Sequence, residues 1–211
     1  MIAIINYGLG NLGSIQNMLK VIGENSVLTD DADVVHKADK MILPGVGAFD
    51  AGMTNLEAKG LDKIIKEETA DGKPILGICL GMQLLGRKSE EGQKTGLGLI
   101  PFDNKKFNFD NVEIPNDIRS MLKIPHMGWD IVEFEKKDNP LVKNIDGQQR
   151  YYFVHTYHAV CDNSENVLMT CDYGYKFAAS VFRDNIYGVQ FHPEKSHDFG
   201  MRILENFAKN C

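Results

Sequence analysis

Short apolar runs alternate with amphipathic stretches through the first half of the chain. The apolar runs are rich in β-branched residues, which favour strands, and the stretches between them have helical spacing. Strands are predicted at 2–6, 40–43 and 74–78, and helices from about residue 12 and over 56–68 and 82–87. Because helices of this length serve as crossovers between parallel strands, the pattern predicts an α/β fold with a mostly parallel central sheet flanked by helices.

The second half has a different pattern, in which strand-like segments follow one another with turn residues between them. The segments are 129–134, 151–154, 167–170, 177–182 and 186–191. The last two are joined through 183–185 as a hairpin, so this half is expected to add an antiparallel strand section. A final helix is predicted over 198–208, and the Asn- and Lys-rich stretch 102–123 is predicted to be a surface excursion. We interpret residues 1–211 as one domain.

Composition and charge exclude several classes of function. The 23 basic and 29 acidic residues give a formal charge of -6, and without a basic block this opposes nucleic-acid binding. No apolar run reaches the roughly 20 residues that span a bilayer, and no signal peptide is evident. The four cysteines lack CxxC spacing, so free thiols and a cytoplasmic location are expected. His155, His158 and His197 have no spacing typical of metal ligands, so we expect satisfied or solvent-facing histidines and no metal or cofactor.

Cys79 is the clearest candidate nucleophile. It lies in Gly-Ile-Cys-Leu-Gly at 77–81, where an apolar strand leads directly into a predicted helix. This is the form of a nucleophile elbow, in which the central residue has a strained backbone and small residues two positions away allow the tight bend. A helix N-terminus also favours the reactive thiolate. The segment alone leaves open the alternative that Cys79 is a small buried hydrophobic residue.

A candidate base and its orienting group follow the last predicted strand. His192 and Glu194 are two residues apart, so they face the same side if the extended conformation persists. A histidine can accept the proton of a cysteine, and a carboxylate behind it selects the tautomer and stabilises the imidazolium. Pro193 between them suits a strand that ends at a site. Taken alone, such a pair is more often found on a protein surface.

Two sequence blocks resemble the class I, triad-type glutamine amidotransferases. They are Gly-Ile-Cys-Leu-Gly-Met-Gln at 77–83 and Gln-Phe-His-Pro-Glu-Lys at 190–195. Within that class the chain resembles the glutaminase subunits of imidazole glycerol phosphate synthases. The blocks that carry this closer resemblance are Asn-Tyr-Gly-Leu-Gly-Asn at 6–11, Pro-Gly-Val-Gly-Ala-Phe at 44–49, His-Met-Gly-Trp at 126–129 and Tyr-Phe-Val-His-Thr-Tyr at 152–157.

The resemblance implies a role for each reacting group. Cys79 would attack the side-chain amide of glutamine, and His192 would protonate the leaving ammonia. Glu194 would orient His192, and water would then cleave the thioester to release glutamate.

The resemblance also implies an oxyanion hole. The family's oxyanion strand corresponds to 44–47, so backbone N–H groups of Val46, Gly47 or Leu80 would stabilise the tetrahedral oxyanion. A plain β-turn is the competing explanation of the glycines. By analogy with the family, we expect weak activity in isolation because this strand is wrongly oriented until a partner docks.

Substrate contacts follow from the same resemblance. Gln83 and Glu91 would hold the α-amino and carboxylate ends of glutamine, and the backbone at Thr156 and Tyr157 would contribute. The alternatives are that Gln83 is an exposed helix residue and that Glu91 belongs to a solvated acidic turn with Glu90.

The implied partner is a (β/α)8-barrel cyclase, which would receive the ammonia and form a heterodimer with this chain. Asn11, Trp129 and Lys195 match family positions near that interface, although a core role for Trp129 is an open alternative. Two departures from the family bear on the partner. Asp130 stands where the family usually has Asn, and the segment 102–123 is longer than expected.

Three other functions are considered. A duplicated copy of such a subunit can supply ammonia for amidotransfer in surface-sugar biosynthesis. A stand-alone cysteine peptidase or γ-glutamyl hydrolase can use the same scaffold, because fold and nucleophile do not determine the reaction. A catalytically silent binding module would be expected to lack a member of the triad, and none is missing from the sequence.

Overall fold

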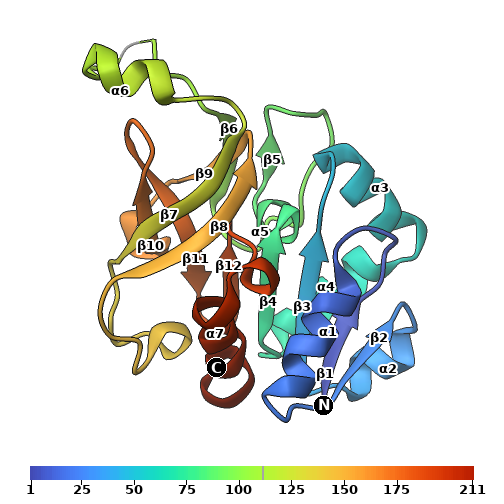
Figure 1. Ribbon diagram of the computed structural model, residues 1–211. Helices are drawn as coiled ribbons and strands as arrows, with labels where there is room; N and C mark the ends of the chain where they lie inside the picture. The colour runs from blue at the N-terminus through green and yellow to red at the C-terminus, as the bar shows by residue number, and fades with distance from the viewer. Residues whose placement is uncertain (111) are drawn as a thin grey trace.

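The structure, a computed structural model, describes residues 1–110 and 112–211, and a single mixed sheet runs through it (Figure 1). The main path of the sheet has the strand order β2-β1-β3-β4-β12-β11-β10-β7-β8. Strands β5, β6 and β9 branch from this path, because β9 pairs with β11 and with β6, and β6 pairs with β5. The fold is therefore α/β with a mixed sheet, as predicted.

The first half of the path is parallel, as the alternating pattern predicts. Its strands are β1 (Ile2–Ile5), β2 (Ser26–Thr29), β3 (Lys40–Gly45), β4 (Ile75–Cys79) and β12 (Ile186–Val189). Each neighbouring pair from β2 to β12 is parallel. The crossover helices are α1 (Leu12–Val21), α2 (Ala32–Lys37), α3 (Phe49–Ala58), α4 (Leu61–Ala70) and α5 (Leu80–Leu85), and α7 (His197–Asn210) closes the chain.

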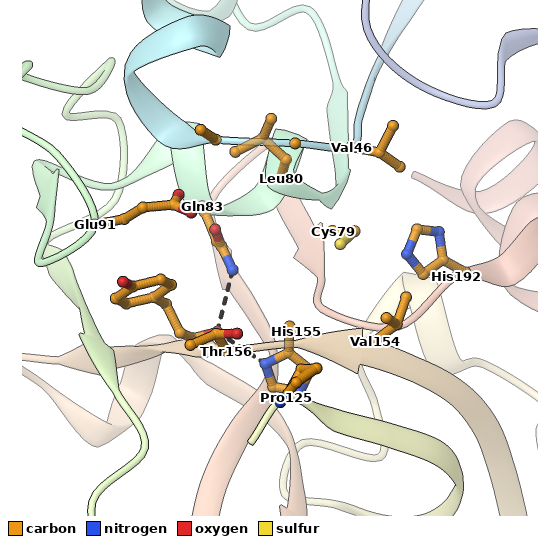
Figure 2. Close-up of a pocket in the computed structure, with 13 residues that line it drawn as sticks. Val46, Cys79, Leu80, Gln83, Glu91, Pro125, Val154, His155, Thr156 and His192 are labelled. Atoms are coloured by element: carbon orange, nitrogen blue, oxygen red, sulfur yellow. Dashed lines mark hydrogen bonds between the residues drawn. The ribbon is translucent and has the colours of Figure 1, made fainter. Parts of the chain in front are cut away.

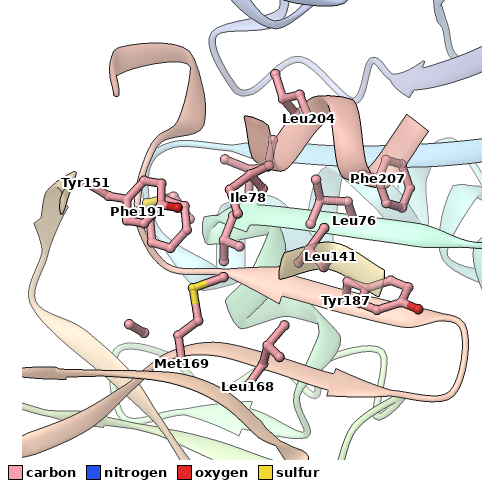
Figure 3. Close-up of a cluster of buried hydrophobic side chains, with 14 of the residues drawn as sticks. Leu76, Ile78, Leu141, Tyr151, Leu168, Met169, Tyr187, Phe191, Leu204 and Phe207 are labelled. Carbon is pink, nitrogen blue, oxygen red and sulfur yellow. The ribbon is translucent and has the colours of Figure 1, made fainter. Parts of the chain in front are cut away.

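Helices cover both faces of the parallel strands. On β1, the side chains of Ile2 and Ile4 belong to one buried cluster, and those of Ala3 and Ile5 belong to another, because alternate residues of a strand point to opposite faces. The first cluster includes residues of α1 and α7, and the second includes residues of α2, α3, α4 and α5. Figure 3 shows Leu204 of α7 and Leu76 of β4 within the first cluster. The near-continuous apolar strands are those of a sheet buried on both faces.

The second half of the path is antiparallel. It contains β11 (Lys176–Arg183), β10 (Val167–Asp172), β7 (His126–Phe134) and β8 (Gln149–His155), and the branch contains β9 (Tyr157–Cys161), β6 (Phe102–Lys106) and β5 (Lys88–Ser89). The predicted hairpin is confirmed, since Arg183 of β11 pairs with Ile186 of β12. Asp184 in its turn has a positive φ of 52°, a conformation that Asp tolerates better than most residues.

The structure corrects two of the predicted segments. The stretch 102–123 is not only a surface excursion, because Phe102 and Phe107 are buried and β6 pairs with β9 over 102–106. Later in this stretch, the short helix α6 (Asn116–Met121) has no buried residues and does lie on the surface. The single helix predicted over 56–68 is two helices, α3 and α4, because the chain breaks at Gly60, whose φ is +68°.

Strands β3, β4 and β12 are neighbours in the sheet and point in the same direction. Their carboxyl ends therefore bring 46–47, Cys79 and the residues after Val189 to one edge, which is where ligands bind in open α/β sheets. Among the helices of the described residues, none combines the length and the apolar character that crossing a bilayer requires.

Candidate active site

Cys79 occupies a strained turn between β4 and α5. Its φ and ψ are 54° and −109°, outside the regions that L-residues ordinarily adopt. Gly77 and Gly81, the small residues on either side of Cys79, have no room for a side chain. A Cβ on Gly77 would lie 2.7 Å from the carbonyl oxygen of Gly81, and a Cβ on Gly81 would lie 1.7 Å from the carbonyl oxygen of Leu43. The predicted elbow geometry is therefore present, and it presents the thiol beyond the end of the sheet.

His192 and Glu194 form a buried pair. The distance from Nδ1 of His192 to Oε1 of Glu194 is 2.8 Å, and the two side chains are 1% and 2% exposed. The backbone of His192 is held in place, because its N–H donates to the carbonyl of Tyr152 at 2.9 Å and its carbonyl accepts from Oγ of Ser196 at 2.6 Å. With Nδ1 facing the carboxylate, Nε2 is left for the thiol of Cys79.

The extended conformation predicted for this pair is wrong. Strand β12 ends at Val189, and the 3-10 turn Pro193–Lys195 follows His192. Pro193 begins the turn because its φ suits helical geometry and it has no N–H for a sheet ladder. The turn carries the carboxylate of Glu194 to the imidazole, so the contact arises from local curvature and not from strand periodicity.

The environment of His192 favours its protonated form. Burial lowers the pKa of His192, but its interaction with Cys79 and its hydrogen bond and charge interaction with Glu194 outweigh burial and raise the pKa from 6.5 to about 9. The contribution of these interactions to folding stability is therefore fully present below about pH 6.5 and is lost as the pH rises through about 9. At neutral pH His192 is therefore an imidazolium, and it lines the same cavity as Cys79.

Glu194→Gln should lower the rate of ammonia release about 10²-fold, because the amide no longer stabilises the imidazolium or selects its tautomer. The alkaline limit of activity should also move to lower pH, since one of the two interactions that raise the pKa of His192 to about 9 is removed. The measurement is the pH dependence of kcat for ammonia release in wild type and variant. An unchanged alkaline limit would show that Glu194 does not set the protonation of His192.

A cavity of about 510 Å³ lies at this edge of the sheet (Figure 2). It is lined by residues from the ends of β3, β4 and β8 and from α5, and it contains every predicted catalytic, oxyanion and substrate residue except Glu194, which lies behind His192. These lining residues are Val46, Gly47, Cys79, Leu80, Gln83, Glu91, Thr156, Tyr157 and His192. The fold thus brings together positions that are up to 146 residues apart (46 to 192).

Gln83 and Glu91 are both held by the protein. Gln83 is buried, which excludes the exposed helix role, and its Nε2 donates to the carbonyl of Tyr157 and to Oε1 of Gln190, both at 3.1 Å. Glu91 is exposed, but its Oε2 accepts the N–H of Phe49, the first residue of α3, at 2.7 Å. Each side chain therefore reaches the cavity in a defined orientation.

The backbone carbonyls of Thr156 and Tyr157 already accept hydrogen bonds within the protein. The carbonyl of Thr156 accepts the N–H of Phe107 at 3.1 Å, and the carbonyl of Tyr157 accepts from Gln83 and from Nδ1 of His155 at 2.8 Å. A contact between glutamine and this segment would therefore fall to the backbone N–H groups.

The predicted oxyanion segment, 44–47, is held at its first residue and accessible at its last two. The hydroxyl of Tyr7 donates to the carbonyl of Pro44 at 2.7 Å, and a Cβ on Gly45 would lie 2.3 Å from that hydroxyl. Beyond this point Val46 is 41% exposed, and Gly47 has a φ of +110° with no atom within 4 Å of a built Cβ. This end of the segment is therefore accessible to solvent, and the activation by a partner stays a prediction.

Sequence reasoning missed Gln190 as a site residue. Its buried side chain donates from Nε2 to Sγ of Cys79 at 3.8 Å, a contact that supports negative charge on the sulfur. Gln190 was present in the block that carries the family resemblance, immediately before Phe191 and His192. Its position one residue beyond β12 was the available signal.

The predicted interface residues lie outside the cavity. Trp129 on β7 is 37% exposed, which excludes a core role, and its ring stacks on His197 at 5.5 Å. Nζ of Lys195 lies 5.5 Å from the ring centre of Tyr152, whose ring is 6.1 Å from that of Trp129. Asn11 is the residue before α1, the helix that packs against the turn containing Lys195.

His158 and His197 agree with the expectation of satisfied or solvent-facing histidines. His158 is buried, and its Nε2 lies 2.9 Å from the hydroxyl of Tyr175, whereas His197 is exposed. Within residues 1–110 and 112–211, no group of three His, Cys, Asp or Glu residues is arranged to hold a metal ion.

Comparison with known proteins identifies the class. The family described as glutamine amidotransferase class-I matches residues 3–211, and the chain belongs to this family. Within it, the chain is 51% identical to imidazole glycerol phosphate synthase subunit HisH 2 of Methanococcus maripaludis, with 100% of both chains covered. It is 45% identical to the subunit HisH 2 of Pseudomonas aeruginosa, with 99% of both covered. These findings confirm the resemblance drawn from the sequence blocks.

Solved structures agree on the fold. PurLQS from Thermotoga maritima superposes with a TM-score of 0.71 at 20% identity, covering 98% of this chain and 96% of that one. A structure described as glutamine amidotransferase gives a TM-score of 0.72 at 15% identity, with 98% of both chains covered.

Proposed function

We propose that this chain is the glutaminase subunit of an imidazole glycerol phosphate synthase. It hydrolyses glutamine to glutamate and ammonia, and it passes the ammonia to a (β/α)8-barrel cyclase in histidine biosynthesis, in the cytoplasm. Residues 1–211 act as one amidotransferase domain. The observation that carries the proposal is that Cys79, whose backbone is strained, lines the same cavity as His192, with Glu194 at 2.8 Å behind the imidazole.

The reaction proceeds through a covalent thioester. The thiolate of Cys79 attacks the amide carbon of glutamine, and the oxyanion that forms accepts hydrogen bonds from backbone N–H groups at Leu80 and at Val46 or Gly47. His192, protonated at neutral pH, gives its proton to the leaving amine, so ammonia departs as the thioester forms. The neutral imidazole then removes a proton from water, which attacks the thioester and releases glutamate.

Gln83 and Glu91 recognise the amino-acid end of glutamine. The nitrogen of the Gln83 amide donates both of its hydrogens within the protein, so its oxygen is the atom that accepts from the substrate ammonium. One carboxylate oxygen of Glu91 holds the start of α3, and the other supplies the second acceptor. The backbone N–H groups near Thr156 receive the substrate carboxylate.

The partner docks on the face that carries Trp129, Lys195 and Asn11. The relatives at 51% and 45% identity are named as subunits, which supports a partner subunit. An exposed tryptophan, here with the guanidinium of Arg150 5.6 Å from its ring centre, is the kind of anchor that protein interfaces use. Docking there also closes the cavity against water, which keeps ammonia from escaping.

The test is ammonia release from glutamine with and without the organism's own barrel cyclase and its ribulosyl substrate. We expect release by the chain to rise about 10²-fold on docking and imidazole glycerol phosphate to form, because the partner orients the oxyanion strand. Ammonia release that does not respond to that cyclase would contradict the partner assignment and favour the surface-sugar alternative. Cleavage of peptides without ammonia release would favour the hydrolase alternative.

A matched pair of variants tests the docking face. Trp129→Ala should lose the stimulation by the cyclase, whereas Val21→Ala, which removes an apolar side chain that is 71% exposed on α1, should retain it. Equal stimulation of the two variants would place the interface elsewhere.

A further inference from the structure

The segment from Pro44 to Phe49 links strand β3 to helix α3 at the substrate cavity. Its residues 46–48 line the cavity, and they include the backbone N–H groups proposed as oxyanion donors. An oxyanion donor is effective only when it is held at the place where the charge develops. What holds the two ends of the 44–49 segment therefore determines how far its donors can move.

The first end of the 44–49 segment is held by the buried side chain of Tyr7. Its hydroxyl lies 2.7 Å from the carbonyl oxygen of Pro44, and because a carbonyl oxygen only accepts, the hydroxyl is the donor. A Cβ built on Gly45 would lie 2.3 Å from this hydroxyl and 3.0 Å from Cβ of Leu80. The α-carbon of Gly45 therefore lies against both the phenol and the first residue of α5.

The loop that carries Tyr7 is held in turn. Nδ2 of Asn55, on helix α3, donates to the carbonyl of Tyr7 at 3.0 Å. Gly10 in the same loop has a φ of +114°, and a Cβ on it would lie 3.2 Å from Cβ of Pro44 and 3.3 Å from the backbone nitrogen of Gly45. The loop after β1 therefore packs directly on the peptide whose carbonyl Tyr7 binds.

The other end of the 44–49 segment is held by Glu91. Oε2 of this carboxylate lies 2.7 Å from the backbone nitrogen of Phe49, whose N–H can only donate. The loop of Glu91 is also bound to the first turn of α3, because the carboxylate of Asp50 accepts the N–H groups of Gln93 and Lys94, both at 2.9 Å. The two carboxylates thus make reciprocal contacts between the loop and the helix start.

We propose that Tyr7 and Glu91 are positioning residues that hold the two ends of the 44–49 segment, so that any reorientation of it is confined to residues 45–48. The inference rests on the proposed glutaminase function, in which Glu91 also meets the substrate ammonium. One carboxylate then sets the position of glutamine and of the oxyanion donors. The donors act on the tetrahedral oxyanion and not on bound glutamine, so the loss of either anchor should lower kcat.

Tyr7→Phe removes the hydroxyl and keeps the ring. We expect kcat for ammonia release, measured with the cyclase, to fall about tenfold and the KM for glutamine to stay within about twofold of wild type. Alkylation of Cys79 by iodoacetamide displaces iodide without forming an oxyanion, so its rate should stay within about twofold. Tyr151→Phe is the matched control, because its buried hydroxyl has no hydrogen-bond partner among the described residues, and its kcat should be that of wild type.

Glu91→Gln and Glu91→Ala separate the anchor from substrate recognition. The amide still accepts the N–H of Phe49 but lacks the charge that meets the ammonium, so KM should rise about tenfold while kcat stays within about twofold. Alanine removes the acceptor as well, so kcat should also fall about tenfold. Glu90→Ala is the matched control, because that carboxylate accepts the N–H of Lys106, and both constants should be those of wild type.

Amide hydrogen exchange followed by NMR tests the anchors without any activity. The N–H of Gly45 belongs to the peptide whose carbonyl Tyr7 binds, so it should exchange at least about tenfold faster in Tyr7→Phe than in Tyr151→Phe. The N–H of Phe49 should do the same in Glu91→Ala but not in Glu91→Gln.

Two results overturn the inference. The first is wild-type exchange at Gly45 and Phe49 in the variants that lose an anchor, or a kcat of Tyr7→Phe equal to that of its control. The second is an equal fall of kcat and of the alkylation rate in Tyr7→Phe, because the variant would then have displaced the thiol. If wild type releases no ammonia, the proposed function fails, while the exchange result still decides whether the two anchors hold the segment.

Discussion

Cys79→Ser should lower the rate of ammonia release at least about 10⁴-fold, with the fold intact. A hydroxyl does not ionise under conditions in which a thiol does, so His192 and the elbow then have no anionic nucleophile to present. The side chain is 7% exposed and differs from serine by one atom, so little packing changes. The measurement is ammonia release in the presence of the cyclase, with thermal unfolding followed by circular dichroism to verify folding.

Cys211→Ser is the matched control for this experiment. Cys211 is also a free thiol, but it is the residue after α7 and is not among the residues that line the cavity. Its activity should stay within about twofold of wild type, as for a substitution away from the site. Ammonia release by Cys79→Ser at a rate near that of the control would contradict the covalent mechanism.

The candidate site is predictable from sequence where its geometry is local. The elbow depends on Gly77, Cys79 and Gly81 within five consecutive positions, so the pattern specifies the turn directly. The pairing of His192 and Glu194 was also predicted, but for the wrong reason, because Pro193 starts a 3-10 turn that brings the two side chains together.

Two long-range hydrogen bonds near the cavity, between His126 and His155 and between Gln83 and Gln190, could not be predicted in this way. His126 and His155 meet because they are opposite each other in the β7–β8 register, and Gln83 meets Gln190 across 107 positions of sequence. Pairing register depends on which strands become neighbours, and no short pattern encodes that choice. Asp130 was noted as a departure from the family, and its contact with His126, four residues earlier on the same strand, was not predicted.

The fold, like the site, could be predicted where a local pattern determines it and not where strand pairing does. The alternation of apolar runs and helical stretches in the first half predicts parallel strands and crossover helices. Strand β5 has only two residues, and β2, with the sequence Ser-Val-Leu-Thr, is not a continuous apolar run like the other parallel strands. Strand β6 was hidden in the polar stretch Phe102–Lys106, because its pairing with β9 and the burial of Phe102 depend on the rest of the sheet.

Gly81→Ala should lower the free energy of unfolding by about 3 kcal/mol or more, a large effect for one methyl group. The new Cβ would lie 1.7 Å from the carbonyl oxygen of Leu43 and 2.8 Å from its carbonyl carbon. These are backbone atoms of β3, a strand paired on both sides, so no flexible side chain can move away. Helix α5 must instead shift from β3, which also displaces Cys79. Urea unfolding gives the free energy, and ammonia release should fall in parallel.

Gly13→Ala makes the same chemical change where space is free, and it shows whether the cost comes from the close approach. Gly13 is exposed in α1, and no atom lies within 4 Å of a built Cβ. Alanine there should raise the free energy of unfolding by about 0.5 kcal/mol, because it restricts the unfolded chain and favours the helix. If Gly81→Ala were as stable as Gly13→Ala, the contact between α5 and β3 would not hold the elbow in place. The turn itself would then have to maintain the strain at Cys79. The expected result instead means that the close contact with Leu43 keeps α5 from relaxing away from the sheet.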